Sequence, residues 1–418
     1  MSDGIPRATP AENAAFIAAF LLPGLLRGTV TTARPGHTVT NRLGTLGYAH
    51  RLTAQLRERY GGRPVLVKGL AGPTLLVLSG EDVREVLSAS DEVYSLAAPE
   101  KLKGLAPFLD GTLLLSTGAE RRERAAFVGE VLGSAETAHR MADRFAEIAA
   151  EEAATLVPGV VTYDRLDACW NRVARRCLYG DAARDDHELS RVLARLRLAG
   201  NWAGLRGRAQ ARLSARYDEL ITGHLLRAEP GSLAALAAAT PRGPATSVVR
   251  QAAFWLMGFT VPTPALMQSL ALLASFPCPP ARLRGCLLEG LRLWAPVPVL
   301  VRTTTRDTDW YGDVLPAGTS VLIPLILHAR DSRLGYAHTF SPGIWDDGTA
   351  EREWLLGPFS RGDGQCKGMN LALHVATAFL AELLRRATPE LEGRPLPPRL
   401  PLMLDTLKLR IVLREAAR

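Results

Sequence analysis

Apolar residues recur at helical spacing along most of this chain. Residues 40–60 show an amphipathic pattern, and residues 119–236 are almost wholly helical in pattern and rich in Ala, Leu and Arg. Residues 246–276 are apolar on nearly all sides, which predicts a long and largely buried helix. A further helix is predicted to end at Leu293, before a proline-rich turn. The pattern therefore predicts a mainly helical protein.

Short strands are predicted between these helices, at residues 65–67, 75–78, 299–304, 320–323 and 407–413. The first two are joined by Gly-Leu-Ala-Gly-Pro, which indicates a hairpin. No internal repeat, low-complexity segment or convincing linker interrupts the sequence. We expect one domain over residues 1–418, mainly α with small β-sheets, in which residues 1–35 form a surface helix or extension.

The N-terminal region carries one apolar stretch, residues 14–22, which we expect to end at Pro23. It is shorter than the ~20 residues of a membrane-spanning helix, and it lacks the basic start and small-residue cleavage site of a signal peptide. We expect a surface helix, no transmembrane segment and a cytoplasmic protein. The alternative is shallow membrane contact through Phe16, Phe20 and Leu25.

Composition is that of an ordinary folded protein, with 418 residues, 47% hydrophobic and 22% charged. These values exclude disorder and collagen-like repeats. The formal net charge of +8 favours acidic partners, but no motif for nucleic-acid binding accompanies it. Five cysteines without C-x-x-C spacing argue against a disulfide framework and against a zinc site. One cysteine therefore calls for a separate explanation.

Residues 358–368, Pro-Phe-Ser-Arg-Gly-Asp-Gly-Gln-Cys-Lys-Gly, carry the strongest motif. They fit F-x-x-G-x-x-x-C-x-G at all four fixed positions, Phe359, Gly362, Cys366 and Gly368. Glycines let a backbone turn tightly and approach a flat ligand. Because the cysteine precedes a predicted helix, free N–H groups and the helix dipole favour its thiolate, a ligand for soft metal centres such as haem iron. The alternative, a buried structural cysteine, does not explain the fixed spacing.

This string resembles the haem-binding loop of the cytochrome P-450 superfamily, and the chain is similar to its soluble bacterial members. The resemblance implies haem b between the long central helix and the helix that follows the cysteine. Cys366 would be the axial iron ligand, Phe359 would pack near the sulfur, and Gly362 and Gly368 would allow close approach. The position two before the cysteine, often basic in the superfamily, is Gly364, so that Arg361 or another arginine would bind a haem propionate.

Two further arginines are candidates for propionate binding under this resemblance. Arg302 follows the proline-rich turn, where the superfamily has a strand arginine. Arg124 matches the arginine of a helix that crosses the other propionate, although the aromatic companion expected four residues earlier is Glu120. A planar guanidinium suits a carboxylate. Arg121 and Arg122, by contrast, fit a plain basic helix face nearly as well as a functional role.

Glu289 and Arg292 match the structural E-x-x-R of the superfamily. At i, i+3 they share a helix face and can pair. Their partner motif would be residues 340–345, Phe-Ser-Pro-Gly-Ile-Trp, where the expected arginine is Ile344. We therefore expect an incomplete ion network with a structural role.

The long apolar helix departs from the superfamily's A-G-x-[DE]-T string, which relays protons during oxygen activation. Gly258 is retained, but Thr260 stands at the acid position and Val261 at the alcohol position. Prolines at 262 and 264 should kink the helix and free two carbonyls. These carbonyls and the hydroxyls of Thr260 and Thr263 would hold a water chain for proton delivery. The alternative is that both threonines cap the broken helix.

The resemblance implies a monooxygenase that acts on a small apolar, secondary-metabolite molecule. No G-x-G-x-x-G, Walker-A or similar motif is present, so electrons should come from outside. Lys367, Arg361 and the cluster Arg121–Arg124 would form a basic docking face for an acidic ferredoxin. Residues 95–115 and 201–205 would line the substrate pocket. Two alternatives remain, a peroxide-using or rearranging enzyme, prompted by the missing acid–alcohol pair, and a non-catalytic haem sensor or carrier.

Overall fold

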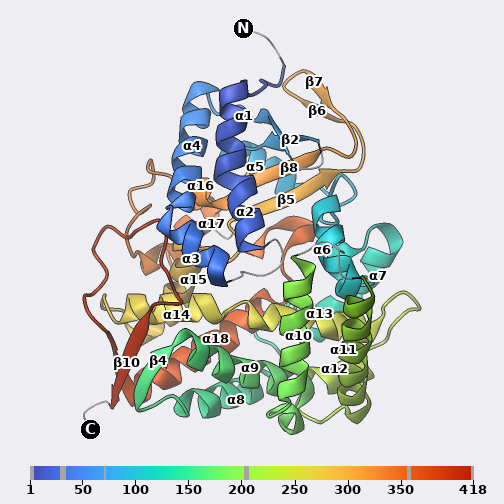
Figure 1. Ribbon diagram of the computed structural model, residues 1–418. Coiled ribbons are helices and arrows are strands. Elements are labelled where there is room, and N and C mark those ends of the chain that lie inside the picture. Colours follow the sequence, from blue (N-terminus) through green and yellow to red (C-terminus); the bar gives the residue numbers. More distant parts are fainter. Residues whose placement is uncertain (1–3, 29–33, 70–71, 202–206, 355–358, 416–418) are drawn as a thin grey trace.

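The computed structural model describes residues 4–28, 34–69, 72–201, 207–354 and 359–415. Helices make up most of it and the strands form three small sheets (Figure 1), so the predicted mainly α fold with small sheets is confirmed. The first helices are α1 (Pro10–Phe16), the π-helical turn η1 (Ile17–Leu21), α2 (Leu22–Arg27), α3 (Arg34–Arg42), α4 (Thr45–Arg59) and α5 (Gly80–Ser88).

The middle of the chain is helical, as its pattern predicts. It contains α6 (Pro99–Leu109), η2 (Leu113–Leu115), α7 (Gly118–Val131), α8 (Ala142–Ala154), α9 (Tyr163–Tyr179), η3 (Asp181–Ala183), α10 (His187–Gly200), α11 (Gly207–Arg227), α12 (Leu233–Ala239), α13 (Val248–Thr260) and α14 (Thr263–Leu273). The C-terminal part adds η4 (Pro280–Arg282), α15 (Leu283–Leu293), α16 (Leu325–Ala329), η5 (Pro342–Trp345), α17 (Thr349–Arg352), η7 (Gly362–Gly364) and α18 (Met369–Arg386).

The largest sheet has the strand order β1-β2-β8-β5-β3, from β1 (Val65–Lys68), β2 (Pro73–Leu76), β8 (Ser320–Pro324), β5 (Val299–Thr304) and β3 (Tyr94–Ser95). Strands β1 and β2 form the predicted hairpin. In the antiparallel pair β5–β8, Arg302 lies opposite Val321. The other sheets are β4-β10-β9, from β4 (Gly159–Thr162), β10 (Arg410–Glu415) and β9 (Ala387–Leu391), and the pair β6 (Thr308–Trp310) and β7 (Asp313–Leu315).

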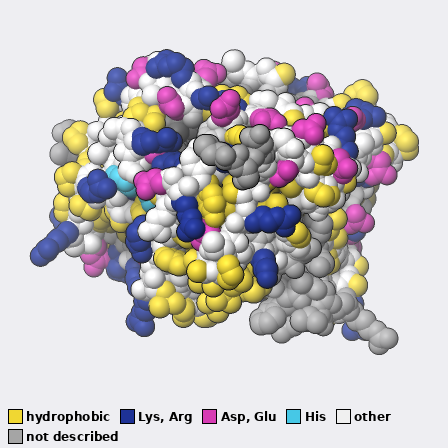
Figure 2. All heavy atoms as spheres, turned by 90° about the horizontal axis from the view of Figure 1, so that it is seen from above, with side chains coloured by type: hydrophobic (Ala, Val, Ile, Leu, Met, Phe, Trp, Pro, Cys, Tyr) yellow, Lys and Arg dark blue, Asp and Glu magenta, His cyan; other side chains and the backbone are white. Residues whose placement is uncertain are grey.

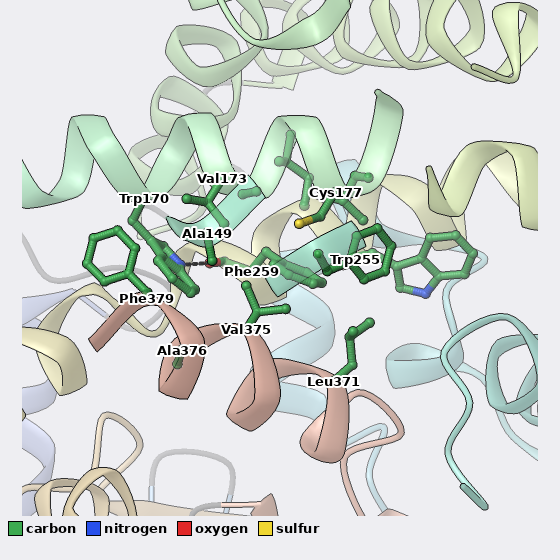
Figure 3. Packing of buried hydrophobic residues seen from close by; sticks show 14 of the residues in the cluster. Ala149, Trp170, Val173, Cys177, Trp255, Phe259, Leu371, Val375, Ala376 and Phe379 are labelled. Atoms are coloured by element: carbon green, nitrogen blue, oxygen red, sulfur yellow. Dashed lines mark hydrogen bonds between the residues drawn. The ribbon is translucent and has the colours of Figure 1, made fainter. Parts of the chain in front are cut away.

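The main core lies where α8, α9, α13, α14 and α18 pack together. In Figure 3, side chains of α9, α13 and α18 point toward one another. Trp170 of α9 meets the ring of Phe379 of α18 edge-on, with centroids 5.5 Å apart. Its indole nitrogen donates a 2.5 Å hydrogen bond to the carbonyl oxygen of Phe259. The helix with the candidate proton relay is thus fixed to the helix that follows the cysteine through one tryptophan.

The N-terminal helix does not end at Pro23, contrary to the expectation. The chain continues through η1 into α2, and Pro23 lies in the first turn of α2, where a missing N–H costs no hydrogen bond. Phe16 is fully buried, which removes it from the candidate membrane contacts, whereas Leu25 is 56% exposed.

The predicted long apolar helix is present but broken, as its prolines predict. Helices α13 and α14 meet at Val261 and Pro262. Together, residues 248–273 are long and apolar enough to cross a membrane by length and composition alone. Of the apolar window, 67% is buried inside the protein, as in the core helix of a globular fold.

Two of the five cysteines form a disulfide that was not predicted from the sequence. Cys278, before η4, is bonded to Cys286 of α15. Their spacing matches no motif, but the proline-rich turn between α14 and α15 brings the loop back onto α15. The free cysteines are Cys169 and Cys177, both buried, and Cys366.

Candidate metal centre

The cysteine loop folds back on itself and holds Cys366 just before α18. The backbone N–H of Cys366 donates to the carbonyl of Phe359 over 2.8 Å, and the N–H of Met369 donates to the carbonyl of Cys366 over 3.2 Å. Gln365 closes the turn η7 with a 3.0 Å bond to Gly362. The sulfur is therefore fixed at the N-terminal end of α18, which favours negative charge.

Two observations on Cys366 show what kind of surface its sulfur faces. Solvent reaches the side chain, which is exposed. Nevertheless, burial among protein atoms raises the pKa of its thiol, while the backbone N–H of Gly368 and the charge of Lys367 act in the opposite direction. The sulfur is thus accessible although protein atoms lie around it. A bound metal ion would hold such a sulfur as thiolate.

The loop glycines differ in how much room they have. Gly362 has φ +60°, and a Cβ there would clash with the carbonyl oxygen of Leu87 at the end of α5. A Cβ at Gly364 would lie 2.7 Å from Nη2 of Arg302, so glycine at this position leaves room for that arginine. At Gly368 a Cβ would make ordinary contact, 3.6 Å from Leu132, and its predicted role of allowing close approach stays a prediction.

Arg302 of β5 lies beside the cysteine loop. Only 3% of this residue is exposed, and its guanidinium donates to Oγ of Ser360 over 2.6 Å and to the carbonyl of Val301 over 3.1 Å. Neither partner is a carboxylate. Burial, with a smaller effect from the charge of Arg121, lowers the pKa of Arg302 to about 10. A buried cation of this kind calls for an anion.

Arg361 also lies on the loop with unused donors. Its guanidinium stacks over the ring of Trp354, with Cζ 5.6 Å from the centroid. Its Nε and Nη2 are buried and have no hydrogen-bond partner in the described part of the chain. Arg302 and Arg361 together therefore offer the cysteine loop two guanidinium groups that a ligand with two carboxylates would satisfy.

The arginines of α7 have different partners in this structure. Arg124 donates to the carbonyl of Ala245 over 2.8 Å and pairs with Glu120 at 2.9 Å, and its role in propionate binding stays a prediction. Arg121 is the one that contacts the loop, through a 3.1 Å bond to the carbonyl of Asp363, and it pairs with Asp91.

The pairing of Arg124 with Glu120 could have been predicted from the sequence. Glu120 and Arg124 are four residues apart, the spacing at which opposite charges pair along a helix.

Both Arg121 and Arg124 are buried, and the exposed Arg122 pairs with Glu92. Arg361 stacks on Trp354 as described above. The basic docking face predicted from Lys367, Arg361 and the cluster Arg121–Arg124 is therefore not formed as an open cationic surface.

The E-x-x-R pair forms a fully buried structural bond. Both side chains are 0% exposed, and Arg292 meets both carboxylate oxygens of Glu289 at 2.6 and 2.8 Å. The carboxylate also accepts bonds from the backbone N–H of Ser341 and from Nε1 of Trp345. The network is thus completed by an indole next to Ile344, where an arginine was expected.

The accessible face of the broken helix carries no hydroxyl group. Gly258 is exposed, and a Cβ there would meet nothing within 4 Å, so open space lies beside it. Phe254 and Val261, one turn away on either side, are partly exposed. The carbonyl of Gly258 is not free, because it accepts from the N–H of Val261 over 3.2 Å.

Thr260 and Thr263 are bonded to other helices instead. Thr260 donates to the carbonyl of Met257 over 2.8 Å and accepts from Nη1 of Arg197 of α10 over 3.0 Å. Thr263 donates to Asp167 of α9 over 3.0 Å. This geometry favours the interpretation in which both threonines stabilise the helix break. Their role in proton delivery stays a prediction.

The residues around Cys366 fit a haem. An accessible sulfur at the start of a helix, the buried cation Arg302 whose partners Ser360 and Val301 are neutral, and the unsatisfied donors of Arg361 match an iron porphyrin with two propionates. Of the predicted pocket segments, residues 95–115 form β3, α6 and η2, whereas residues 202–205 lie outside the described residues.

A family model described as Cytochrome P450 matches residues 282–413. Cytochrome P450 734A5 from Oryza sativa subsp. japonica is 36% identical over 115 residues, 26% of this chain and 21% of that protein. Secologanin synthase 1 from Catharanthus roseus is 38% identical over 105 residues, 24% of this chain and 20% of that protein. The aligned parts thus span about a fifth of these curated relatives.

A solved structure is similar over most of the chain. The 6-coordinated cytochrome P450 from Thermus thermophilus superposes with a TM-score of 0.66 and 21% identity. The match covers 87% of this chain and 98% of that chain. It shows that the two proteins share a fold.

Proposed function

Because this chain belongs to the cytochrome P450 superfamily, we propose that it is a haem-thiolate monooxygenase that inserts oxygen from O2 into a small apolar molecule, an intermediate of secondary metabolism. The observation that carries this proposal is the accessible sulfur of Cys366, which the loop holds at the N-terminal end of α18. The residues around this sulfur determine what else the chain would contribute.

The family implies haem b as the cofactor, whose iron binds and activates dioxygen when the haem is in place. Cys366 would be its protein ligand, and Arg302 and Arg361 would hold its propionates through charge-assisted bonds. Gly364 keeps Arg302 in position, since any larger residue would push the guanidinium away from Ser360. Because the loop holds the sulfur in place before any ligand binds, haem binding would cost little conformational entropy.

Substrate binding would rely on apolar contact. The accessible face of α13 carries Phe254, Gly258 and Val261, none of which ionises. Buried Phe108 and Leu113 in the segment 95–115 add to an apolar lining. An apolar wall excludes water and favours a ligand without charged groups. Because this wall offers no ionisable side chain, the substrate's own functional groups would determine how it is oriented.

Proton delivery would use water or a substrate group. The hydroxyl of Thr260 receives a hydrogen bond from Arg197, which holds no acidic proton at neutral pH, and donates to the carbonyl of Met257. No carboxylate of α13 lies at positions 260 or 261. Gly258 leaves open space in which ordered water can approach the helix.

Electrons would come from a separate acidic redox protein such as a ferredoxin. The support is the excess of 50 Lys and Arg over 42 Asp and Glu, together with the lack of a fused nucleotide-binding motif. Because the predicted cationic cluster is largely buried or paired, the docking charge would be spread over the surface. Reduction rates should then fall only gradually with added salt.

A second candidate function follows from the threonines. Both hydroxyls are engaged away from the accessible face, which favours chemistry without a protein proton relay, driven by peroxide or consisting of a rearrangement. Turnover with NAD(P)H, ferredoxin and its reductase supports the first function. Turnover that requires only hydrogen peroxide, or neither, supports the second.

The decisive experiment for the class is the absorbance spectrum of the reduced, carbon monoxide-bound protein. We expect the red-shifted band of a thiolate ligand in the wild type and its loss in Cys366→Ala. The matched control is Cys169→Ala, a buried cysteine of α9 that lies away from the loop and should leave the band in place. Absence of bound haem from the purified wild type would overturn the proposal.

A further inference from the structure

One buried amide joins α13 to the segment between α6 and α7. Gln251 of α13 is 0% exposed, and its Oε1 accepts a hydrogen bond from the backbone N–H of Leu113 over 3.0 Å. Its Nε2 donates to the carbonyl oxygens of Gly111 and Thr246, each over 2.8 Å. The oxygen and both hydrogens of the amide are thus in use. Gln251 therefore holds residues 111–113 against α13.

Further bonds fix the same segment from other sides. The carbonyl of Leu113 accepts from Nη1 of Arg121 over 2.6 Å, and the same arginine also bonds to the cysteine loop. Arg250 of α13 donates to the carbonyl of Phe108, at the end of α6, over 3.3 Å and pairs with Asp218 of α11 at 3.0 Å. Because the segment is bonded to α13 and, through Arg121, to the cysteine loop, a shift of it would break at least one buried hydrogen bond.

Gln251 belongs to the face of α13 that opens at Gly258. Phe254 and Gly258 follow it at i+3 and i+7, and residues at this spacing share a helix face. Along this face, exposure rises from the fully buried Gln251 through the partly exposed Phe254 to the exposed Gly258. The bonds of Gln251 show that residues 111–113 cover the buried end. Because an α-helix rises about 1.5 Å per residue, this cover lies about 10 Å from Gly258 along the axis.

We propose that Gln251 is a positioning residue that sets the length of the substrate space. It holds residues 111–113 as an end wall, so that compact apolar substrates fit and long chains that would run along α13 toward its N-terminus are excluded. This inference rests on the proposed function, because the substrate space begins at the haem that Cys366 would bind.

The end wall selects by shape and not by charge. The large side chains in and next to it, Phe108, Leu113 and Leu115, are apolar and buried in the main core. Apolar walls of this kind discriminate between ligands by size. On the face of the molecule drawn in Figure 2, Lys and Arg side chains are spread among Asp, Glu and hydrophobic side chains, so that this face favours neither sign of ligand charge.

The test is a titration of the holoprotein with 1-butylimidazole and 1-octylimidazole, whose imidazole nitrogen binds haem iron and shifts its absorbance. In an open apolar channel the octyl compound would bind far more tightly, because affinity rises with each buried CH2 group. In the wild type we expect a preference for octyl of no more than about threefold. Gln251→Met keeps the side-chain length and removes the three hydrogen bonds, so the preference should rise by at least about tenfold.

The matched control is Gln268→Met. Gln268 of α14 is 5% exposed, and its Oε1 has no hydrogen-bond partner in the described residues. This variant should keep the wild-type preference. Amide hydrogen exchange of a peptide that spans residues 109–116 should become at least about tenfold faster in Gln251→Met and stay unchanged in Gln268→Met.

Gly111→Ala tests the end wall without altering Gln251. Gly111 has φ +79°, so alanine strains the same segment, and the preference for octyl should rise by about threefold. This variant decides the matter if Gln251→Met does not fold. A wild-type preference above about tenfold, or an unchanged preference in a variant whose residues 109–116 exchange faster, would overturn the inference. If the proposed function itself fails, the outcome differs, because the wild type would then hold no haem and neither azole would shift its absorbance.

Discussion

The indole Nε1 of Trp345 donates a 3.0 Å hydrogen bond to Oε1 of Glu289, so a neutral donor completes the network around a fully buried carboxylate. A hydrogen bond to a buried charge stabilises more than one between neutral groups. We expect Trp345→Phe to lower the free energy of unfolding by about 2 kcal/mol, measured by denaturant unfolding of the holoprotein.

The matched control for this prediction is Trp255→Phe. Trp255 is 5% exposed, and its indole nitrogen is buried without a hydrogen-bond partner in the described residues. Both substitutions remove the same ring volume, but only one removes a hydrogen bond. Equal losses of stability in the two variants would show that ring volume, not the bond to Glu289, determines the effect.

Variants of the candidate-site arginines should differ in haem retention according to the groups that each arginine contacts. Arg302→Gln and Arg361→Gln should each weaken haem retention by about tenfold or more, because a charge-assisted bond to a carboxylate would be lost. Arg124→Gln should leave haem retention unchanged although its side chain is also buried, since it bonds to Ala245 and Glu120. Transfer of haem to an acceptor protein measures retention. Loss of haem in Arg124→Gln alone would contradict the assignment.

The sequence predicts those features of the protein that depend on residues close together in the chain. The F-x-x-G-x-x-x-C-x-G string identifies Cys366 because the loop geometry is set by neighbours in the chain. The break between α13 and α14 follows from the missing N–H of Pro262 and Pro264 in the same way.

The sequence does not predict how a helix is oriented toward residues that are far away in the chain. Whether Arg121 or Arg124 faces the loop depends on how α7 is rotated against it, which no local pattern records. The indole of Trp345 could not be predicted as the substitute donor, because its bond to Glu289 joins residues 56 positions apart.

Acid should destabilise the fold through His328. The imidazole belongs to α16, the short helix that follows β8, and burial lowers its pKa from 6.5 to about 4. The unfolded chain therefore binds a proton at higher pH than the folded protein does. The stabilising contribution of the neutral ring is fully present above pH 6.5 and is lost as the pH falls toward 4.

The shift corresponds to up to about 3 kcal/mol for this one group. His328→Asn keeps a donor for the backbone of Val77 and should flatten the fall in unfolding free energy between pH 6.5 and pH 4. The control is His187→Asn at the start of α10, an exposed histidine. An unchanged pH profile in His328→Asn would contradict the prediction.

The hydroxyl of Thr263 should act on stability and not on proton delivery. It donates a 3.0 Å bond to Asp167, and burial raises the pKa of that carboxyl, while the bond from Thr263 lowers it. Thr263→Val keeps the shape and removes the bond, which should cost about 1 kcal/mol of unfolding free energy. Product formed per electron consumed should stay at the wild-type value, because the hydroxyl does not face the open side of α13 at Gly258. Loss of coupling in Thr263→Val at unchanged stability would instead assign the hydroxyl to the proton path.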